Sequence, residues 1–336
     1  MDLPAFIRAL PKAELHLHIE GTLEPELMFQ LAGRNRVALA HATVAELRAA
    51  YAFENLQGFL DLYYAGSAAL VREQDFHQLA QAYFRRAAAD GVVHAELFFD
   101  PQAHTARGIA FGTVLDGLER AAREARAELG LSSRLIMCFL RHLPEQDAFA
   151  TLDQAMPHLH RIHGVGLDSA EAAHPPSRFA RVFRRCRDLG LRAVAHAGEE
   201  GPAAFVTEAL DSLGVERIDH GVRAMEDPGL VARLAREGIP LTVCPLSNLK
   251  LQGVASLADH ALKRMLAAGL NVTVNSDDPA YFGGYIAQNY LEVALALDLS
   301  RADLVTLARN SLRASFVSAA ERTPWLAALD AVEHAN

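Results

Sequence analysis

Short apolar runs alternate along the chain with longer segments of helical periodicity. Eight runs have the length and composition of buried strands, namely AELHLHI (13–19), VVHAELFFD (92–100), RLIMCFL (134–140), GVGLD (164–168), LRAVAHAG (191–198), RIDHG (217–221), IPLTVCP (239–245) and LNVTVNSDD (270–278). Between them, apolar residues recur at spacings of three and four, with a glycine near the segment end, as in FARVFRRCRDLG and PGLVARLAREG. This alternation predicts βα units and a parallel sheet.

Eight such units most naturally close into a (β/α)8 barrel of the TIM type. The segment from about Leu23 to Gly91, after the first strand, is predicted to be a helical insertion. Within it, FENLQGFLDLYYAG (53–66) carries aromatic side chains that could cover the barrel mouth as a lid or simply pack the insertion onto the barrel. No linker or repeat divides the chain, so we expect one domain over residues 1–336.

The first predicted strand ends in His16-Leu17-His18, and alternate strand positions point to one face. Two imidazoles therefore converge, as a metal ion requires. Three later runs also end in ionisable residues, in AVAHAGEEG (193–201), RIDHG and VTVNSDDPAYFGG (272–284). Because barrel sites form at the carboxyl ends of strands, these ends are expected to meet. They bring together His16, His18, His196 and Asp277 as candidate ligands of a divalent metal, with Glu199, His220 and Asp278 beside them.

Nitrogen and oxygen ligands without a thiolate suit zinc, although iron or manganese could occupy the same set. Structural alternatives stay open for single residues. Asp277 and Asp278 could belong to an Asp-Pro turn in which one carboxylate caps the next segment. His220 could be a core histidine held by Asp219, and most of the 15 histidines are expected to be structural or exposed.

Composition narrows the class of function. A chain of 336 residues with 51% hydrophobic and 22% charged residues can bury a large core. A net charge of −9 argues against a nucleic-acid partner and favours a small neutral or cationic substrate. Three widely spaced cysteines, Cys138, Cys186 and Cys244, indicate neither a disulfide framework nor a thiolate zinc site. Without a signal-peptide pattern or a membrane-length apolar segment, we expect a cytoplasmic protein without membrane contact.

One motif is misleading. His18-Ile19-Glu20 matches the HxE half of the zinc nucleobase-deaminase signature, but the PCxxC half is missing. The cytidine-deaminase-type fold is excluded on that ground.

Five segments together resemble the adenosine/adenine deaminase family of the amidohydrolase superfamily, most closely its adenine deaminase branch. They are PKAELHLHIEGTLEP (11–25), HAGEEGP (196–202), RIDHGVR (217–223), TVCPLSN (242–248) and TVNSDDPAYFGG (273–284). The resemblance implies a (β/α)8 barrel with one zinc per chain and hydrolytic deamination of adenine to hypoxanthine in purine salvage. It implies these roles: zinc ligands His16, His18, His196 and Asp277, proton donor Glu199, catalytic histidine His220 and substrate contact Asp278.

The same resemblance points to further substrate contacts. The backbone of Gly166 resembles the family position that contacts purine N3. Glu20 stands where adenosine deaminases typically have an aspartate that binds a ribose hydroxyl, and its longer side chain would encroach on that space, which favours a free base. In GLDSAE (166–171), Asp168, Ser169 or Glu171 could meet the N9 edge.

Alternative functions stay open at this point. A deaminase of N6-substituted adenines, such as cytokinin-like bases, would use the same zinc chemistry, whereas adenosine and 6-aminodeoxyfutalosine are disfavoured by Glu20. A different class would be a non-catalytic purine-binding barrel. Such a protein would be expected to have lost a ligand or the proton donor, and all of these residues are present. A homo-oligomer is compatible with the resemblance, and the surface composition does not decide it.

Overall fold

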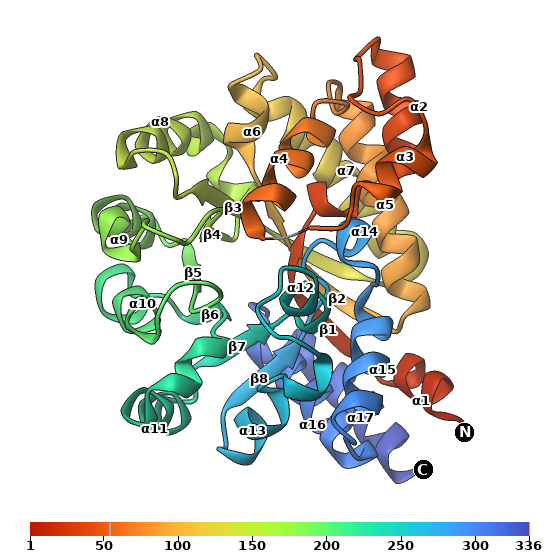
Figure 1. Ribbon diagram of the computed structural model, residues 1–336, viewed down its shortest axis with the longest axis vertical. Helices are drawn as coiled ribbons and strands as arrows, with labels where there is room; N and C mark the ends of the chain where they lie inside the picture. Colours follow the sequence, from red (N-terminus) through yellow and green to blue (C-terminus); the bar gives the residue numbers. More distant parts are fainter. Residues whose placement is uncertain (54, 336) are drawn as a thin grey trace.

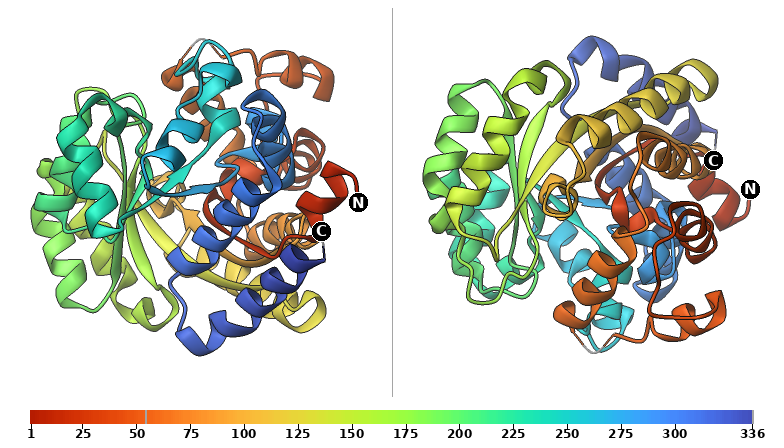
Figure 2. Two further views of the ribbon diagram at one scale, coloured as in Figure 1. Left: turned by 90° about the horizontal axis from the view of Figure 1, so that it is seen from below. Right: turned by 90° about the horizontal axis from the view of Figure 1, so that it is seen from above.

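Eight parallel strands form one sheet whose spatial order follows the sequence. A computed structural model describes residues 1–53 and 55–335 of the chain. The strands are β1 (Lys12–His18), β2 (Val92–Phe99), β3 (Ser132–Leu140), β4 (Gly164–Asp168), β5 (Arg192–Ala197), β6 (Arg217–His220), β7 (Pro240–Val243) and β8 (Asn271–Val274). The sheet curls into a barrel inside a layer of helices (Figures 1 and 2). The predicted (β/α)8 barrel is confirmed.

The first and last strands are connected by backbone hydrogen bonds at the carboxyl end of β1. β8 ends at Val274, and the chain reaches β1 beyond that point, where Leu17 and Asp277 form a parallel bridge. The amide of His18 donates to the Asp277 oxygen, and the amide of Asp277 donates to the His16 oxygen, both at 3.1 Å. Backbone pairing therefore holds three candidate ligands in register.

The predicted insertion between β1 and β2 is helical. It contains η1 (Glu20–Thr22), α2 (Pro25–Asn35), α3 (Val44–Ala49), α4 (Leu56–Ser67) and α5 (Glu73–Ala89). Helix α4 begins after Asn55, whose side chain accepts a hydrogen bond from the amide of Gly58 (2.9 Å), as expected for an asparagine N-cap. Figure 1 shows the insertion, in red to orange, on the side of the barrel away from α8 to α10.

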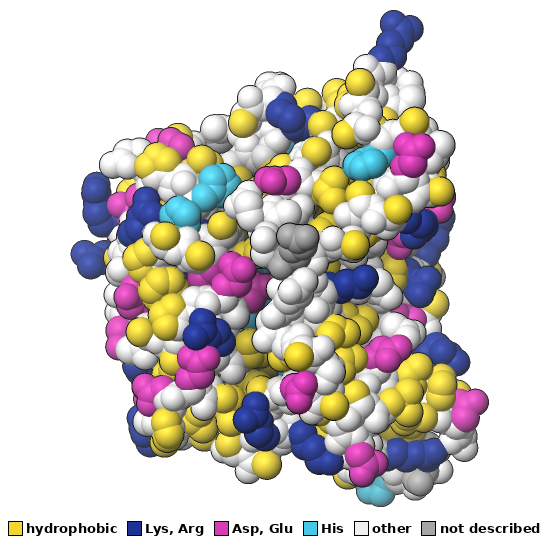
Figure 3. Space-filling view, in the orientation of Figure 1, with side chains coloured by type: hydrophobic (Ala, Val, Ile, Leu, Met, Phe, Trp, Pro, Cys, Tyr) yellow, Lys and Arg dark blue, Asp and Glu magenta, His cyan; other side chains and the backbone are white. Residues whose placement is uncertain are grey.

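The remaining helices surround the strands. They are α1 (Leu3–Ala9), α6 (Pro101–Thr105), α7 (Phe111–Leu129), α8 (Glu145–Ala155), α9 (Ala180–Asp188), α10 (Ala203–Glu208), α11 (Pro228–Glu237), α12 (Pro245–Lys250), α13 (Leu262–Ala267), α14 (Pro279–Phe282), α15 (Ile286–Ala296), α16 (Arg301–Ala314) and α17 (Ala319–His334). Among the described residues, no helix combines the length and apolar character needed to cross a bilayer. Basic and acidic side chains intermingle on the face shown in Figure 3.

Two apolar clusters make up the core. The larger one includes residues of the strands and the outer helices, and the smaller one consists of Phe98, Ile136, Cys138 and Val194. The Phe98 ring lies 5.1 Å, centroid to centroid, from the rings of His16 and His18. Through Phe98, the smaller cluster therefore packs against the two histidines of β1.

Candidate functional site

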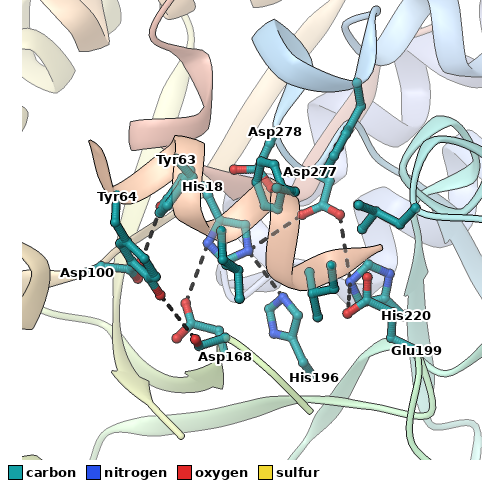
Figure 4. A pocket seen from close by; sticks show the side chains of 16 residues that line it. His18, Tyr63, Tyr64, Asp100, Asp168, His196, Glu199, His220, Asp277 and Asp278 are labelled. Carbon is teal, nitrogen blue, oxygen red and sulfur yellow. Dashed lines mark hydrogen bonds and ion pairs between the residues drawn. The ribbon is translucent and has the colours of Figure 1, made fainter. Parts of the chain in front are cut away.

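Four candidate ligands meet at the carboxyl end of the barrel. His18 Nε2 lies 3.1 Å from His196 Nε2, and Asp277 Oδ1 lies 3.2 Å from His16 Nε2 and 3.5 Å from His18 Nε2. One donor atom from each of the four lies within 4.8 Å of the others, and all four residues are buried. Figure 4 shows His18, His196 and Asp277 directed toward one another. The structure therefore brings together the four residues that the strand ends predict.

The spacing and the chemistry of these atoms fit a bound metal ion. Metal–nitrogen and metal–oxygen bonds of about 2.0 to 2.2 Å require donor atoms on the order of 3 Å apart, and the distances found here are 3.1, 3.2 and 3.5 Å. His16 Nε2 is buried and has no hydrogen-bond partner of acceptable geometry, which is costly unless another ligand occupies its lone pair. Three imidazoles and one carboxylate form a donor set suited to zinc.

The Asp219 carboxylate faces the Nδ1 atoms of two of the imidazoles. Its carboxylate lies 3.7 Å from His196 Nδ1 and 3.9 Å from His16 Nδ1, and it accepts a hydrogen bond from Thr242 (2.9 Å). Because Thr242 Oγ1 donates to Asp219, it accepts the Nδ1 proton of His16 (3.0 Å), which leaves the Nε2 lone pair of His16 directed inward. The alternative in which Asp219 holds His220 is not what the structure shows, because the His220 Nδ1 atom has no hydrogen-bond partner.

Two further acids, Asp100 and Asp168, lie near the Nδ1 atom of His18, whereas its Nε2 atom faces Asp277. Asp168 Oδ2 is 3.5 Å from His18 Nδ1, and Tyr63 donates to Asp100 Oδ2 (3.2 Å). Burial raises the pKa of Asp168 to about 7, and burial together with the Asp168 charge raises the pKa of Asp100 well above its usual value. Burial and mutual repulsion therefore favour the protonated form of Asp100. Asp100 is not among the site residues predicted from the sequence, although it directly follows β2, and Asp277 likewise follows β8.

Glu199 and His220 lie beside the ligand cluster, and both side chains are uncharged there. His220 Nε2 is 3.5 Å from Glu199 Oε2 and 3.7 Å from Asp277 Oδ2. Burial, followed by the His16 charge, lowers the pKa of His220 to about 3. Burial, followed by the Asp277 charge, raises the pKa of Glu199 well above its usual value. A neutral imidazole and a protonated carboxyl are therefore adjacent at neutral pH.

Backbone strain also marks this site. His220 has φ 62° and Asp277 has φ 63°, in the left-handed region that non-glycine residues rarely adopt. Such strain persists where surrounding structure imposes it, commonly at functional sites.

Asp278 packs on the backbone of Gly21. A Cβ atom at position 21 would lie only 1.9 Å from Asp278 Oδ1. Burial and the Asp277 charge raise the pKa of Asp278 well above its usual value. Asp278 is therefore a neutral carboxyl that can donate a hydrogen bond.

A small cavity opens beside these groups and is lined by His18, His196, Glu199, His220, Asp277 and Asp278 among others. Helix α4 contributes Leu56, Phe59, Leu60, Tyr63 and Tyr64 to its lining. The rings of Phe59 and Tyr63 also contact Tyr281, so they pack the insertion onto the barrel, and the role of a lid stays a prediction.

Hydrogen bonds also connect helix α4 to the barrel. The Tyr64 hydroxyl donates to Ser169 Oγ (3.1 Å), which is hydrogen-bonded to His142 Nδ1 (2.8 Å). This contact joins α4 to the loops after β3 and β4. Ser169 lines the cavity, as does Asp168, so two of the three candidates for the N9 edge are in reach of a ligand.

Glu20 and Gly166 are not among the residues that line the cavity. Glu20 is fully buried and accepts hydrogen bonds from His104 Nε2 (2.8 Å) and the Asp100 amide (3.2 Å). At Gly166, a Cβ atom would lie 2.5 Å from the sulfur of Cys138, so the missing side chain allows close packing inside the barrel. The substrate contacts predicted for Glu20 and Gly166 stay predictions.

Comparisons with known proteins cover nearly the whole chain. A family profile described as adenosine deaminase matches residues 11–332. An adenine deaminase from Sphingopyxis alaskensis is 64% identical over 327 residues, which cover 97% of this chain and 96% of the relative. The crystal structure of an adenine deaminase from Arthrobacter aurescens matches with a TM-score of 0.94 and 54% identity, covering 96% of this chain and 98% of that one.

A more distant structure adds a metal. An amidohydrolase from Burkholderia ambifaria, solved with bound Zn, matches with a TM-score of 0.90 and 28% identity, covering 99% of this chain and 94% of that one. The barrel is thus common to relatives across a wide range of identity.

Proposed function

The chain belongs to the adenosine deaminase family, and on that premise we propose that it is a zinc-dependent hydrolase that converts adenine to hypoxanthine and ammonia in purine salvage. The observation that carries the proposal is the buried ligand cluster with a protonated Glu199 and a neutral His220 beside it. Identity of 64% to an adenine deaminase supports the substrate. The relative with bound Zn supports the metal.

In this mechanism His16, His18, His196 and Asp277 would hold the zinc. When bound, the ion supplies a water whose pKa is lowered from 15.7 toward about 7. His220 accepts a proton from the water that attacks purine C6, because its imidazole is neutral and directed into the site.

The remaining acids act on the purine ring. Glu199 donates its proton to N1, which makes C6 electrophilic. The proton that His220 accepted passes to the amino group, which leaves as ammonia, and the hydroxyl proton on C6 returns to Glu199 as the 6-oxo group forms. Asp278 donates a hydrogen bond to N7, which its raised pKa permits. Asp168 or Ser169 meets the N9 edge.

The preference for a free base over a nucleoside rests on the side chains that line the cavity near Asp168 and Ser169. Five of the lining side chains belong to α4, and one of them, Tyr64, donates a hydrogen bond to Ser169. A ribose at N9 would have to displace this contact if N9 faces Asp168 and Ser169. A cytoplasmic location, a homo-oligomer and a single domain over 1–336 stay predictions.

The test is release of ammonia or amine by the zinc-loaded protein, side by side on adenine, adenosine and N6-isopentenyladenine, with absorbance following the product. Preference for adenine would support the proposal. Preference for the substituted base would keep the mechanism and change the substrate. Preference for adenosine would contradict the inference that the Tyr64–Ser169 contact disfavours a ribose at N9. A zinc-loaded protein that binds purines and turns none of them over would be the non-catalytic alternative.

Replacing Gly21 with alanine is expected to lower kcat/KM for adenine by about 100-fold, because a displacement near 1 Å of a positioned group has an effect of this size. The new methyl group would overlap the Asp278 carboxyl, so that carboxyl must move. The matched control is Gly33→Ala in α2, where a Cβ atom meets nothing within 4 Å. Kinetics with zinc content check the prediction, and wild-type kcat/KM in Gly21→Ala would contradict it.

A further inference from the structure

The loop that carries Glu199 is held by a carboxylate from the neighbouring loop. Glu171, in the loop after β4, is fully buried. Its Oε1 atom accepts a hydrogen bond from the Gly198 amide (2.7 Å), and its Oε2 atom accepts from the amides of Glu199 (3.0 Å), Glu200 (2.9 Å) and Gly201 (2.7 Å). A carboxylate offers about four lone-pair sites. Four consecutive amides therefore use the full accepting capacity of this side chain.

The two glycines at the ends of this segment allow the amides to converge. Gly198 has φ 72°, and a Cβ atom there would lie 2.8 Å from Val206. A Cβ atom on Gly201 would lie 2.6 Å from Glu171 Oε1. Main-chain amides that point to a common centre form an anion-binding concavity, and here a side chain of the same protein occupies it.

Arg141 joins the same two loops from the other side. Its guanidinium is buried and donates to the main-chain oxygens of His174 (2.9 Å) and His196 (2.7 Å). His174 lies three residues after Glu171 in the loop that follows β4. His196 lies in β5, three residues before Glu199. Hydrogen bonds thus fix the main chain on both sides of Glu199.

The direction of the Glu199 side chain depends on this main chain. Its carboxyl approaches His220 Nε2 only to 3.5 Å, longer than an ordinary hydrogen bond. Figure 4 shows the two side chains next to each other at the edge of the cavity. The backbone is therefore the main restraint on where the carboxyl points.

We propose that Glu171 is a positioning residue that orients Glu199 by binding the four amides of residues 198–201. Glu171 does not line the cavity, so it acts through Glu199 and not on the substrate. Its interpretation as a contact of the N9 edge is replaced by this one. The inference rests on the proposed function, in which Glu199 is the proton donor.

The test compares Glu171→Gln and Glu171→Ala with the wild type, as full-length zinc-loaded protein acting on adenine. In Glu171→Gln an NH₂ group replaces one carboxylate oxygen, so at least one of the four amides loses its hydrogen-bond acceptor. In Glu171→Ala all four amides lose theirs. We expect kcat to fall about 10-fold in Glu171→Gln and about 100-fold in Glu171→Ala, with KM within about threefold, because misplacement near 1 Å has effects of this order. Amide hydrogen exchange over residues 198–201 should be faster in both variants, with unchanged zinc content.

Glu145→Gln is the matched control. Glu145 Oε1 also accepts two main-chain amides, from Arg181 (2.9 Å) and Val182 (3.0 Å), but at the start of α9 on the outside of the barrel. This variant should keep the wild-type kcat whatever its thermal stability.

Four results would contradict either the inference or the proposed function. If the wild type deaminates adenine and both Glu171 variants keep its kcat, the inference is overturned. It is also overturned if kcat falls while exchange at 198–201 is unchanged, or if the loss follows loss of zinc. Absence of turnover in the zinc-loaded wild type would overturn the proposed function instead, while unchanged exchange at 198–201 in the variants would still overturn the inference.

Discussion

The Glu199→Gln variant is expected to turn over adenine about 10²- to 10⁴-fold more slowly than the wild type, the range typical of a missing general acid. Glutamine has nearly the same shape, and its amide can donate a hydrogen bond, but it cannot release a proton to the ring. Because burial and the Asp277 charge raise the pKa of Glu199 well above its usual value, the wild-type carboxyl carries that proton at neutral pH. KM should change little, since the substrate still fits the site.

Steady-state kinetics with zinc content measured on the same sample check this prediction. The control is Glu226→Gln, a surface position whose side chain is 52% exposed and which should behave as the wild type. Full activity in Glu199→Gln would contradict the role of proton donor. A loss that follows loss of zinc would show that Glu199 supports the metal site instead.

The fold could be predicted because each strand is a short apolar run between helical segments. The boundaries are less certain where a run ends in polar residues. The last run was extended to residue 278, but β8 ends at Val274. Asn275 ends the regular ladder, since its side-chain oxygen accepts the amide of Leu15 (2.9 Å) and its own amide donates to Val243 (2.9 Å). A side chain that replaces a backbone partner leaves no signal in the apolar pattern.

The candidate ligands could be predicted because their position at strand ends is visible in the sequence. Their supporting residues could not. Asp219 precedes His220 and was a candidate partner for it, but neighbouring residues of a strand point to opposite faces. Asp219 instead reaches His16 and His196, on β1 and β5. These pairings depend on how the barrel closes.

Two acidic residues have contacts that only the fold reveals. Glu20 begins a short 3₁₀ helix, and its carboxylate turns toward His104, 84 positions along the chain. Glu171 lies 27 to 30 positions before the amides that it binds. Sequence position suggested substrate contacts for both, because a buried acid near a site is chemically similar to a ligand-binding one until its partners are known.

The largest expected effect is that of Asp277→Asn, which should lower both zinc affinity and turnover. Asp277 provides the carboxylate of the cluster, and although burial alone would raise its pKa, the charges of His16, His220 and His18 hold that pKa well below its usual value. Asparagine keeps the shape and tolerates the left-handed backbone at φ 63°, but it cannot offset the metal charge. Since loss of an outer partner alone typically lowers affinity 10- to 100-fold, loss of a direct ligand should exceed about 100-fold.

The same variant tests the number of ligands. Catalytic zinc usually has three protein ligands, and four would be present here with Asp277. Titration of metal-stripped protein should restore wild-type activity at one zinc per chain, whereas Asp277→Asn should require excess zinc and remain slow. Asp298→Asn is the matched control, because Asp298 is exposed and also has a left-handed backbone, with φ 49°. Wild-type zinc affinity in Asp277→Asn, with turnover lost, would leave the three histidines as the ligands and assign Asp277 to the reacting water and His220.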